Sequence, residues 1–248
     1  MCTCKLISIH SLLLEVSPIK LRTGLLKVDE AFNGGLHEGE VTLLFGEAGS
    51  GKTALALQLA LRGCLEGLKV LYAYTDGFFP YPRIEALAKE ISASLNSLSS
   101  KFHVNHLTKL DDLVGLVRAV ELGCLDHDLL IFDTFTSLYK SLDIRSRRDL
   151  VLHNKKLNQL TAILKNHVIK TKKRVVLTSR LRFLLTSEEL IDEPIASNIL
   201  TYWSDNIVSI HKLDVPLQRK IMLLKIHGYE SNIEVVAHIV NGFLREVD

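Results

Sequence analysis

The residues best suited to chemistry lie in one short stretch, Gly46-Glu47-Ala48-Gly49-Ser50-Gly51-Lys52-Thr53. This stretch fits the phosphate-loop pattern G-x-x-x-x-G-K-[S/T] at every position. Glycines let the backbone curl so that successive N–H groups face a phosphate. In such a loop Lys52 would reach the β- and γ-phosphates, and the Thr53 hydroxyl would bind Mg²⁺. We therefore predict a phosphate and Mg²⁺ site formed by these eight residues.

The elements on either side of this loop must position it. Residues 41–45 (VTLLF) are apolar and partly β-branched, which is typical of a buried strand. Residues 54–61 (ALALQLAL) are strong helix formers, and the positive end of that helix dipole would face the bound anion. The alternative is a glycine-rich turn that binds nothing, but the strand–loop–helix context favours the phosphate site.

A second candidate is Asp133, which ends the apolar run Leu129-Leu130-Ile131-Phe132. An aspartate in that place holds Mg²⁺ in phosphate-loop enzymes, directly or through water. Many strands end in aspartate, and the side chain could instead cap the following turn. The upstream glycine loop is what makes the metal interpretation informative.

Composition limits the class of protein. The chain has 248 residues, of which 47% are hydrophobic, and a net charge of +2 from 30 basic and 28 acidic residues. One large α/β core is expected at this length, and the charge neither indicates nor excludes nucleic acid. No apolar run approaches a membrane span, and the start does not resemble a signal peptide. We expect a cytoplasmic protein with reduced thiols, in which Cys64 and Cys124 are core residues.

The remaining pattern predicts an α/β fold with a mostly parallel sheet, flanking helices and a C-terminal antiparallel extension. Residues 1–21 form an N-terminal extension, an edge strand or a short helix, and residues 22–248 form one core domain. Residues 183–198 read mainly as a loop, Trp203 as a core residue, and the histidines as neither ligands nor catalysts. The predicted strands after the first are 69–74, 129–133, 174–178, 206–211, 220–227 and 233–239, with helices after residue 82, at 111–120 and at 149–170.

With these motifs placed, the chain from about residue 22 resembles the ATPase core of the RecA/RadA recombinase superfamily. The resemblance favours the short archaeal RadA paralogues, because this chain leaves no room for the separate DNA-binding domain of full recombinases. It implies a RecA-like fold, ATP and Mg²⁺ as cofactors, and a role in DNA recombination. The residues that carry it are Arg22-Thr23-Gly24, Asp29, Asn33-Gly34-Gly35-Leu36, the run from Thr75 to Ile84, the run from Asp133 to Leu138, 156–180 and 198–205.

Three departures from the family pattern affect the expected activity. The catalytic glutamate that orients the attacking water falls on Asp76, whose side chain is one methylene shorter. The asparagine-glutamine pair that senses the γ-phosphate falls on Ser179-Arg180. Residues 1–21 contain no phenylalanine, so the Phe-x-x-Ala segment used for filaments is missing there. We expect weak hydrolysis, with Asp76 and Lys52 as the catalytic residues.

Basic residues supply the remaining expectations. The resemblance places Arg83 against the adenine ring, a role that suits a planar guanidinium, although it could simply face solvent. Arg145, Arg147 and Arg148 fall where the family has its first DNA loop, with a solvated loop as an equal alternative. Arg219-Lys220 aligns with a basic pair that contacts a neighbouring subunit's ATP in family filaments.

The function expected from these residues is an ATP-binding recombinase paralogue in DNA repair and homologous recombination. It would bind single-stranded DNA and assist a full-length RadA-type recombinase or another paralogue. Two other functions are compatible with the sequence: a circadian-clock-type (KaiC-like) regulatory ATPase that does not bind DNA, and a non-catalytic nucleotide-dependent adaptor.

Overall fold

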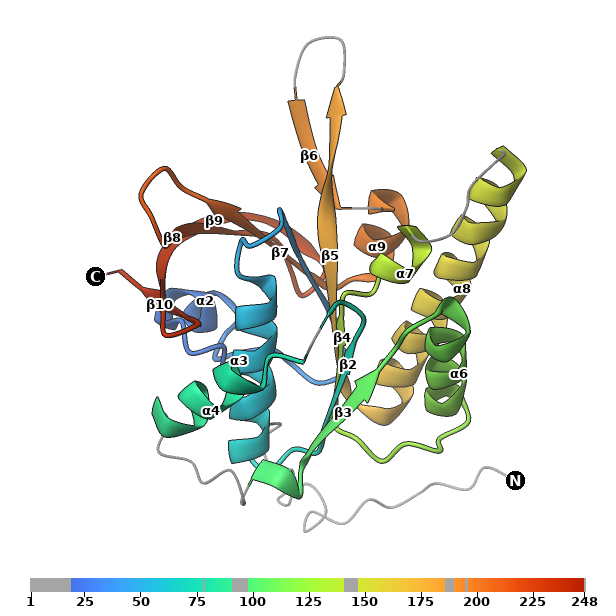
Figure 1. Cartoon of the computed structure of the whole chain (residues 1–248), viewed down its shortest axis with the longest axis horizontal. Coiled ribbons are helices and arrows are strands. Elements are labelled where there is room, and N and C mark those ends of the chain that lie inside the picture. The colour runs from blue at the N-terminus through green and yellow to red at the C-terminus, as the bar shows by residue number, and fades with distance from the viewer. Residues whose placement is uncertain are drawn as a thin grey trace, which may run out of the picture.

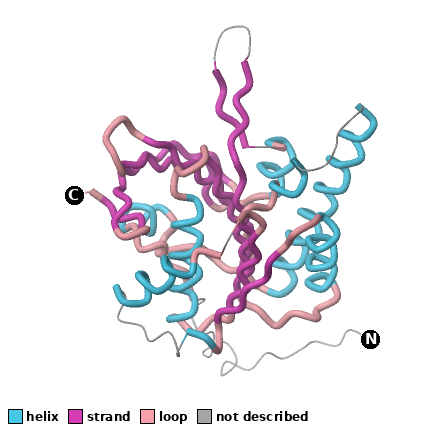
Figure 2. The backbone as a smooth tube through the Cα atoms, in the orientation of Figure 1, coloured by secondary structure: helices cyan, strands magenta, loops and turns pink. Residues whose placement is uncertain are grey.

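The computed structural model describes residues 19–77, 79–90, 98–140, 147–185, 190–194 and 196–247. A sheet of ten strands runs through the middle of the molecule, with helices on both faces (Figure 1). The strand order is β10-β9-β8-β7-β1-β5-β4-β2-β3, and β6 pairs with β5 outside this path. Figure 2 shows the strands, in magenta, as one continuous band between two groups of helices.

The parallel half of the sheet carries the predicted phosphate loop. The strands of this half pair with one another in parallel, and β1 is central, between β5 and β7. All residues of β1 and β4 are buried, as expected for strands covered on both faces. The parallel strands are β1 (Val41–Gly46), β2 (Val70–Tyr74), β3 (Phe102–His106), β4 (Leu129–Asp133), β5 (Arg174–Leu185) and β7 (Asn206–Lys212).

The helices divide between the two faces of the sheet. α2, α3 and α4 pack in one hydrophobic cluster, and α6, α8 and α9 pack in the other. α3 is apolar nearly all round because it lies between the sheet and other elements, with Leu55 and Leu59 at most 2% exposed. Among the described helices we find none with the length and apolar character needed to cross a membrane. Their bounds are α2 (Leu26–Ala31), α3 (Lys52–Leu65), α4 (Tyr81–Glu90), α6 (Leu110–Glu121), α7 (Ser137–Lys140), α8 (Arg147–Thr171) and α9 (Ser197–Trp203).

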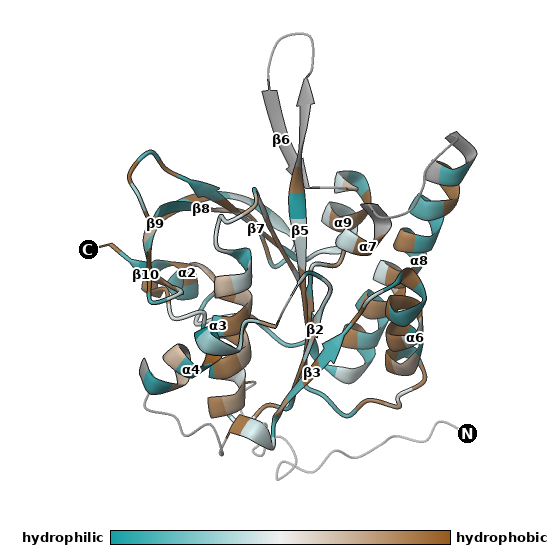
Figure 3. Ribbon diagram, in the orientation of Figure 1, coloured by the Kyte–Doolittle hydropathy of each residue, from teal (hydrophilic) through white to brown (hydrophobic). Residues whose placement is uncertain are grey.

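The C-terminal part extends the sheet with antiparallel strands. β8 (Gln218–Ile226) pairs with β7, β9 (Tyr229–Val240) with β8, and β10 (Phe243–Glu246) with β9. A mostly parallel sheet with this antiparallel extension confirms the predicted fold class. Figure 3 shows the difference between centre and edge, because the central strands are largely coloured as hydrophobic whereas the edge strand β3 is largely hydrophilic.

Several local predictions were wrong. Residues 183–198 are not mainly a loop, since β5 continues to Leu185, β6 spans Leu190–Pro194 and α9 begins at Ser197. The short strands β3 and β10 were missed. β3 has mixed polarity because it is an edge strand in which no residue is buried, and β10 has only four residues. Short strands with weak alternation give little periodic signal.

The N-terminal segment, the two cysteines and Trp203 were each predicted from the sequence. The proposed edge strand in 1–21 lies almost wholly outside the described residues, although Leu21 forms an isolated antiparallel bridge with Leu36. Cys64 is buried as predicted, but Cys124 is exposed, because it follows the end of α6 rather than facing the core. Trp203 is only partly buried, and its indole N–H donates to Asn158 at 2.8 Å.

Candidate nucleotide site

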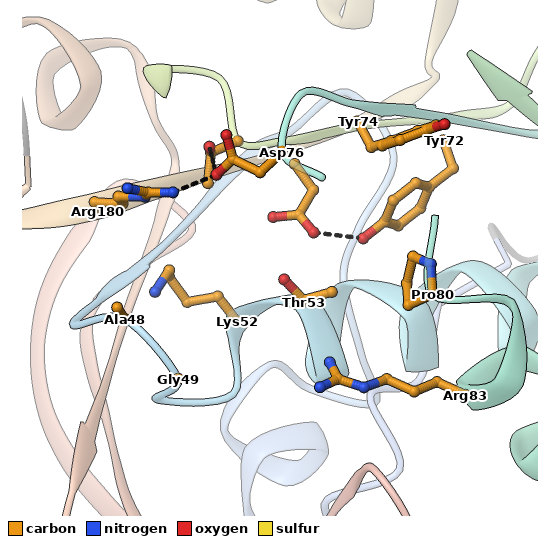
Figure 4. Close-up of a pocket in the computed structure, with 12 residues that line it drawn as sticks. Ala48, Gly49, Lys52, Thr53, Tyr72, Tyr74, Asp76, Pro80, Arg83 and Arg180 are labelled. Carbon is orange, nitrogen blue, oxygen red and sulfur yellow. Dashed lines mark hydrogen bonds and ion pairs between the residues drawn. The ribbon is translucent and has the colours of Figure 1, made fainter. Parts of the chain in front are cut away.

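A cleft of about 360 Å³ lies where the carboxyl ends of β1, β2, β4 and β5 meet. Ligands of open α/β sheets bind at this edge, because the loops that follow parallel strands gather there. Figure 4 shows Lys52 and Thr53 directed from the start of α3 into the cleft, with Asp76 and Arg180 on the opposite side. The lining residues are Ala48, Gly49, Lys52, Thr53, Tyr72, Tyr74, Asp76, Pro80, Arg83, Asp133, Thr134 and Arg180.

The glycine loop is held close to the neighbouring strand. A Cβ on Gly46 would lie 2.2 Å from the Ile210 carbonyl oxygen, so only glycine fits there. Gly49 and Gly51 have φ of 74° and 115°, in the left-handed region that disfavours other residues. The Ser50 Oγ is buried without a hydrogen-bond partner among the described atoms. The loop is therefore tightly curled, in a backbone conformation that depends on its glycines.

Lys52 is the first residue of α3 and is folded back over the loop. Its Nζ donates to the carbonyl oxygens of Gly46 at 2.9 Å and Glu47 at 2.7 Å. Burial lowers the pKa of Lys52 to about 8, although the charge of Asp133 opposes the shift. An anion in the cleft would offer this ammonium a stronger acceptor than two backbone carbonyls.

Arg219 on β8 holds the phosphate loop through two of its carbonyl oxygens. Its guanidinium donates to the carbonyl oxygens of Ser50 at 2.9 Å and Gly49 at 3.2 Å, and the side chain is only 8% exposed. The family resemblance aligned Arg219-Lys220 with a basic pair that contacts a neighbour's ATP in filaments, and in this structure Arg219 contacts the phosphate loop of its own chain. Only the tertiary pairing of β8 beside the loop reveals this role, and no local pattern around the residue does.

Asp133 is fixed by two buried hydroxyl groups. Tyr72 donates its O–H to Oδ2 and Thr178 donates to Oδ1, both at 2.7 Å. The Asp133–Thr134 peptide bond is cis. Burial and the adjacent Asp133 carboxylate raise the pKa of Tyr72 well above its usual value, so it stays a donor. In its described hydrogen bonds Asp133 does not cap the turn, and it keeps lone pairs that can accept from a metal-bound water.

Asp76 follows β2 at the mouth of the cleft and has several donors. Ser137 donates to Oδ1 at 2.7 Å, and Arg180 bonds Oδ2 at 2.5 Å. Burial acts to raise the pKa of Asp76, but the hydrogen bonds from Ser137 and Arg180 and the arginine charge outweigh it and lower the pKa. Arg180, which aligns with the glutamine that senses the γ-phosphate in the family, therefore contacts the candidate catalytic carboxylate directly (Figure 4).

Arg83 on α4 borders a second pocket of about 270 Å³, beside the first. The pocket is also lined by Ile239 and Gly242 from the C-terminal strands. A Cβ on Gly242 would lie 3.6 Å from the Arg83 Cγ, so the aliphatic part of the arginine packs against that glycine. This arrangement places a flat guanidinium beside an apolar wall.

The structure brings most of the predicted site residues together. Besides the lining residues, Gly46, Ser50 and Gly51 form the loop itself, whereas Glu47 turns away and binds Lys212, accepting from its backbone N–H at 3.1 Å. Arg145 and the side chains of Arg147 and Arg148 lie outside the described part. α8 begins at Arg147, and Figure 1 shows that this end of α8 lies toward the cleft edge of the sheet.

The fold and the cleft define a RecA-like ATPase core with a phosphate loop after its central strand. The chain belongs to the Rad51 family, which its residues 15–215 match. It therefore carries a nucleotide-binding ATPase domain of the RecA/Rad51 type.

Similar proteins narrow the group within that family. The DNA repair and recombination protein RadB of Methanosphaera stadtmanae is 29% identical over 217 residues, covering 84% of this chain and 90% of that protein. RadB of Methanobrevibacter smithii is 28% identical over 216 residues, with the same coverage. The crystal structure of a RadB recombinase matches with a TM-score of 0.75 at 23% identity, covering 92% of this chain and 100% of that one. The chain thus resembles RadB in sequence and fold.

Proposed function

We propose that this chain is an ATP-binding, weakly hydrolysing recombinase paralogue that acts in DNA repair and homologous recombination. The observation that carries the proposal is the convergence of Lys52, Thr53, Asp76 and Asp133 on one cleft in a Rad51-family chain. The names of the RadB relatives support the DNA-repair role.

The chemistry of the cleft fits a nucleoside triphosphate and Mg²⁺. Lys52 exchanges its bonds to the loop carbonyls for phosphate oxygens, and the loop N–H groups hold the same phosphates. Thr53 and Asp133 would hold Mg²⁺, and Asp133 would do so through water because both of its oxygens already accept hydrogen bonds. When bound, Mg²⁺ neutralises charge on the phosphates. The base occupies the pocket beside Arg83.

Hydrolysis is slow because Asp76 must both orient a water molecule and release Arg180. The carboxylate is short, and its two oxygens are shared among Ser137, Thr134 and Arg180. A general base works only when it has a free lone pair within reach of the proton it takes. The ion pair therefore holds the site in a resting arrangement between turnovers.

DNA contacts in this proposal come from Arg145, Arg147 and Arg148, the last two of which belong to the first turn of α8. A few arginines give modest, sequence-independent binding to the phosphate backbone of single-stranded DNA. Such weak affinity suits a protein that assists a full-length RadA-type recombinase or another paralogue rather than coating DNA alone.

Anisotropy of labelled single-stranded DNA, at low and moderate salt and with or without ATP, tests this proposal. Wild type should bind at low salt, with a log–log salt slope of about −2 for three phosphate contacts. Replacing Arg145, Arg147 and Arg148 with alanine should abolish binding. The matched control replaces Lys170, Lys172 and Lys173, the basic cluster at the other end of α8, and should keep it. Equal binding by both triple variants, or none by wild type, would favour the regulatory or adaptor role.

A further inference from the structure

Two histidines and a glutamate meet at the edge of the sheet opposite the cleft. Glu40 directly precedes β1, His37 lies three residues earlier, and His227 sits in the turn between β8 and β9. One possible ligand atom from each residue lies within 4.8 Å of the others. β1 has six residues, so this cluster is about 20 Å from the phosphate loop.

Buried polar groups fix two members of this cluster. The Asn206 side chain, which is fully buried, donates to the Glu40 Oε2 at 2.8 Å and accepts from the His227 backbone N–H at 2.8 Å. The Glu40 Oε1 lies 2.7 Å from the His227 Nδ1. Partners of this kind orient the ligands of metal sites. They show that the cluster is a built arrangement and not a chance approach of surface side chains.

The histidine rings have unused nitrogens in the same place. The rings of His37 and His227 stack with centroids 4.0 Å apart, and the Nε2 of each is buried with no hydrogen-bond partner among the described atoms. A buried nitrogen without a partner is costly, so a ligand that filled this position would stabilise the fold.

We propose that His37, Glu40 and His227 bind a divalent transition metal of the Zn²⁺ class, which joins the approach to β1 to the β8–β9 turn. Two imidazoles and a carboxylate suit Zn²⁺ and exclude Mg²⁺ as a competitor, since Mg²⁺ prefers oxygen ligands. The side chains of His227 and Glu40 are 19% and 16% exposed, so an ion can enter from solvent. A water molecule completes the coordination.

Binding requires a small rearrangement of both histidine rings. Ligand atoms around tetrahedral zinc lie about 3.3 Å apart, whereas the possible ligand atoms of His37, Glu40 and His227 now lie up to 4.8 Å apart. The two rings are tilted by only 23°, whereas a shared ion must lie near both ring planes. His37 is in the loop before β1, and turning its side chain opens the stack. The His227 ring must also turn, because its Nδ1 lies only 2.7 Å from the Glu40 Oε1, closer than two ligands of one ion, whereas Asn206 still holds the Glu40 Oε2 and the His227 backbone N–H.

Calorimetric titration of Zn²⁺ into the chelator-treated full chain tests the site, without nucleotide and in excess Mg²⁺. Wild type should bind one equivalent of Zn²⁺. His37→Ala and Glu40→Gln should each weaken the Zn²⁺ affinity at least about tenfold. At a hundred times the dissociation constant, Zn²⁺ should raise the Tm of wild type by about 5–10 °C. His227→Asn should weaken the Zn²⁺ affinity in the same way. Asparagine is chosen because it tolerates the positive φ of 50° at this position.

The control is His103→Ala, which removes the other close imidazole pair, His103 and His127, at 2.9 Å. It should bind Zn²⁺ as wild type does. Co²⁺ spectra separate this site from the cysteines, because thiolate ligands add charge-transfer bands that nitrogen and oxygen ligands lack. Equal affinity in wild type and in the folded His37, Glu40 and His227 variants would overturn the proposal, as would thiolate bands or no stoichiometric binding.

Discussion

Replacing Arg180 with glutamine should increase the rate of ATP hydrolysis. Arg180 and Asp76 are 43% and 45% exposed, so their ion pair is worth about 0.2–1 kcal/mol. Without the ion pair, Asp76 no longer has to spend this free energy to release Arg180 before it orients the water molecule, which corresponds to a turnover increase of about 1.4- to 5-fold. In both proteins the hydrogen bonds from Ser137 and Thr134 still act to lower the pKa of Asp76 against burial, so the side chain stays ionised at pH 7. The change is therefore in the freedom of the carboxylate and not in its charge.

Phosphate release at saturating ATP and Mg²⁺ measures this effect. Lys69→Gln is the matched control, since Lys69 forms a comparably exposed pair with Asp126, just before the start of β2 and far from the cleft. That variant should hydrolyse ATP at the wild-type rate. A slower Arg180→Gln enzyme would refute the restraining role and would show that Arg180 stabilises charge in the transition state.

Three further results follow from the cleft. Nucleotide affinity should fall about tenfold between pH 7 and 9, because the pKa of Lys52 in the free protein is about 8 and the ammonium loses its proton in this range. Lys52→Arg should remove this pH dependence, and a wild-type affinity that does not change with pH would contradict the prediction. Tyr72→Phe should lower the unfolding free energy measured in urea by about 1–3 kcal/mol, because Asp133 loses a buried hydrogen-bond donor. Tyr229→Phe, at an exposed position, should not lower it, and equal urea midpoints for the two variants would count against this prediction. Asp76→Asn should nearly abolish turnover with unchanged ATP affinity, and full retained turnover would reassign the role of Asp76.

The sequence predicted the fold where hydrophobic patterns are long. The strand–loop–helix around Lys52 and the long helix α8 both follow from apolar periodicity and composition. It failed for β3, whose exposed residues break the pattern, and for β6, which exists through pairing with an extended β5. Pairing between segments distant along the chain overrides local propensity in such strands.

The candidate site was predictable where residue type alone carries the chemistry. Lys52, Thr53 and Asp133 were identified from motifs and Asp76 and Arg83 from the family resemblance, and all five line one cleft. The supports of these residues could not be identified in this way. Tyr72 and Arg219 act through contacts that join different strands, and the histidines of the opposite edge lie 190 residues apart. Such contacts depend on the three-dimensional arrangement of the sheet.

Titration of a fluorescent ATP analogue in the presence of Mg²⁺ tests the central claim most directly, that the cleft beside Lys52 binds ATP. Lys52→Ala removes a charge-assisted contact of about 1.5–3 kcal/mol and should weaken binding about tenfold to a hundredfold. Lys69→Ala, which removes an exposed lysine remote from the cleft, should bind as wild type does. Equal affinity of wild type and Lys52→Ala would contradict the account.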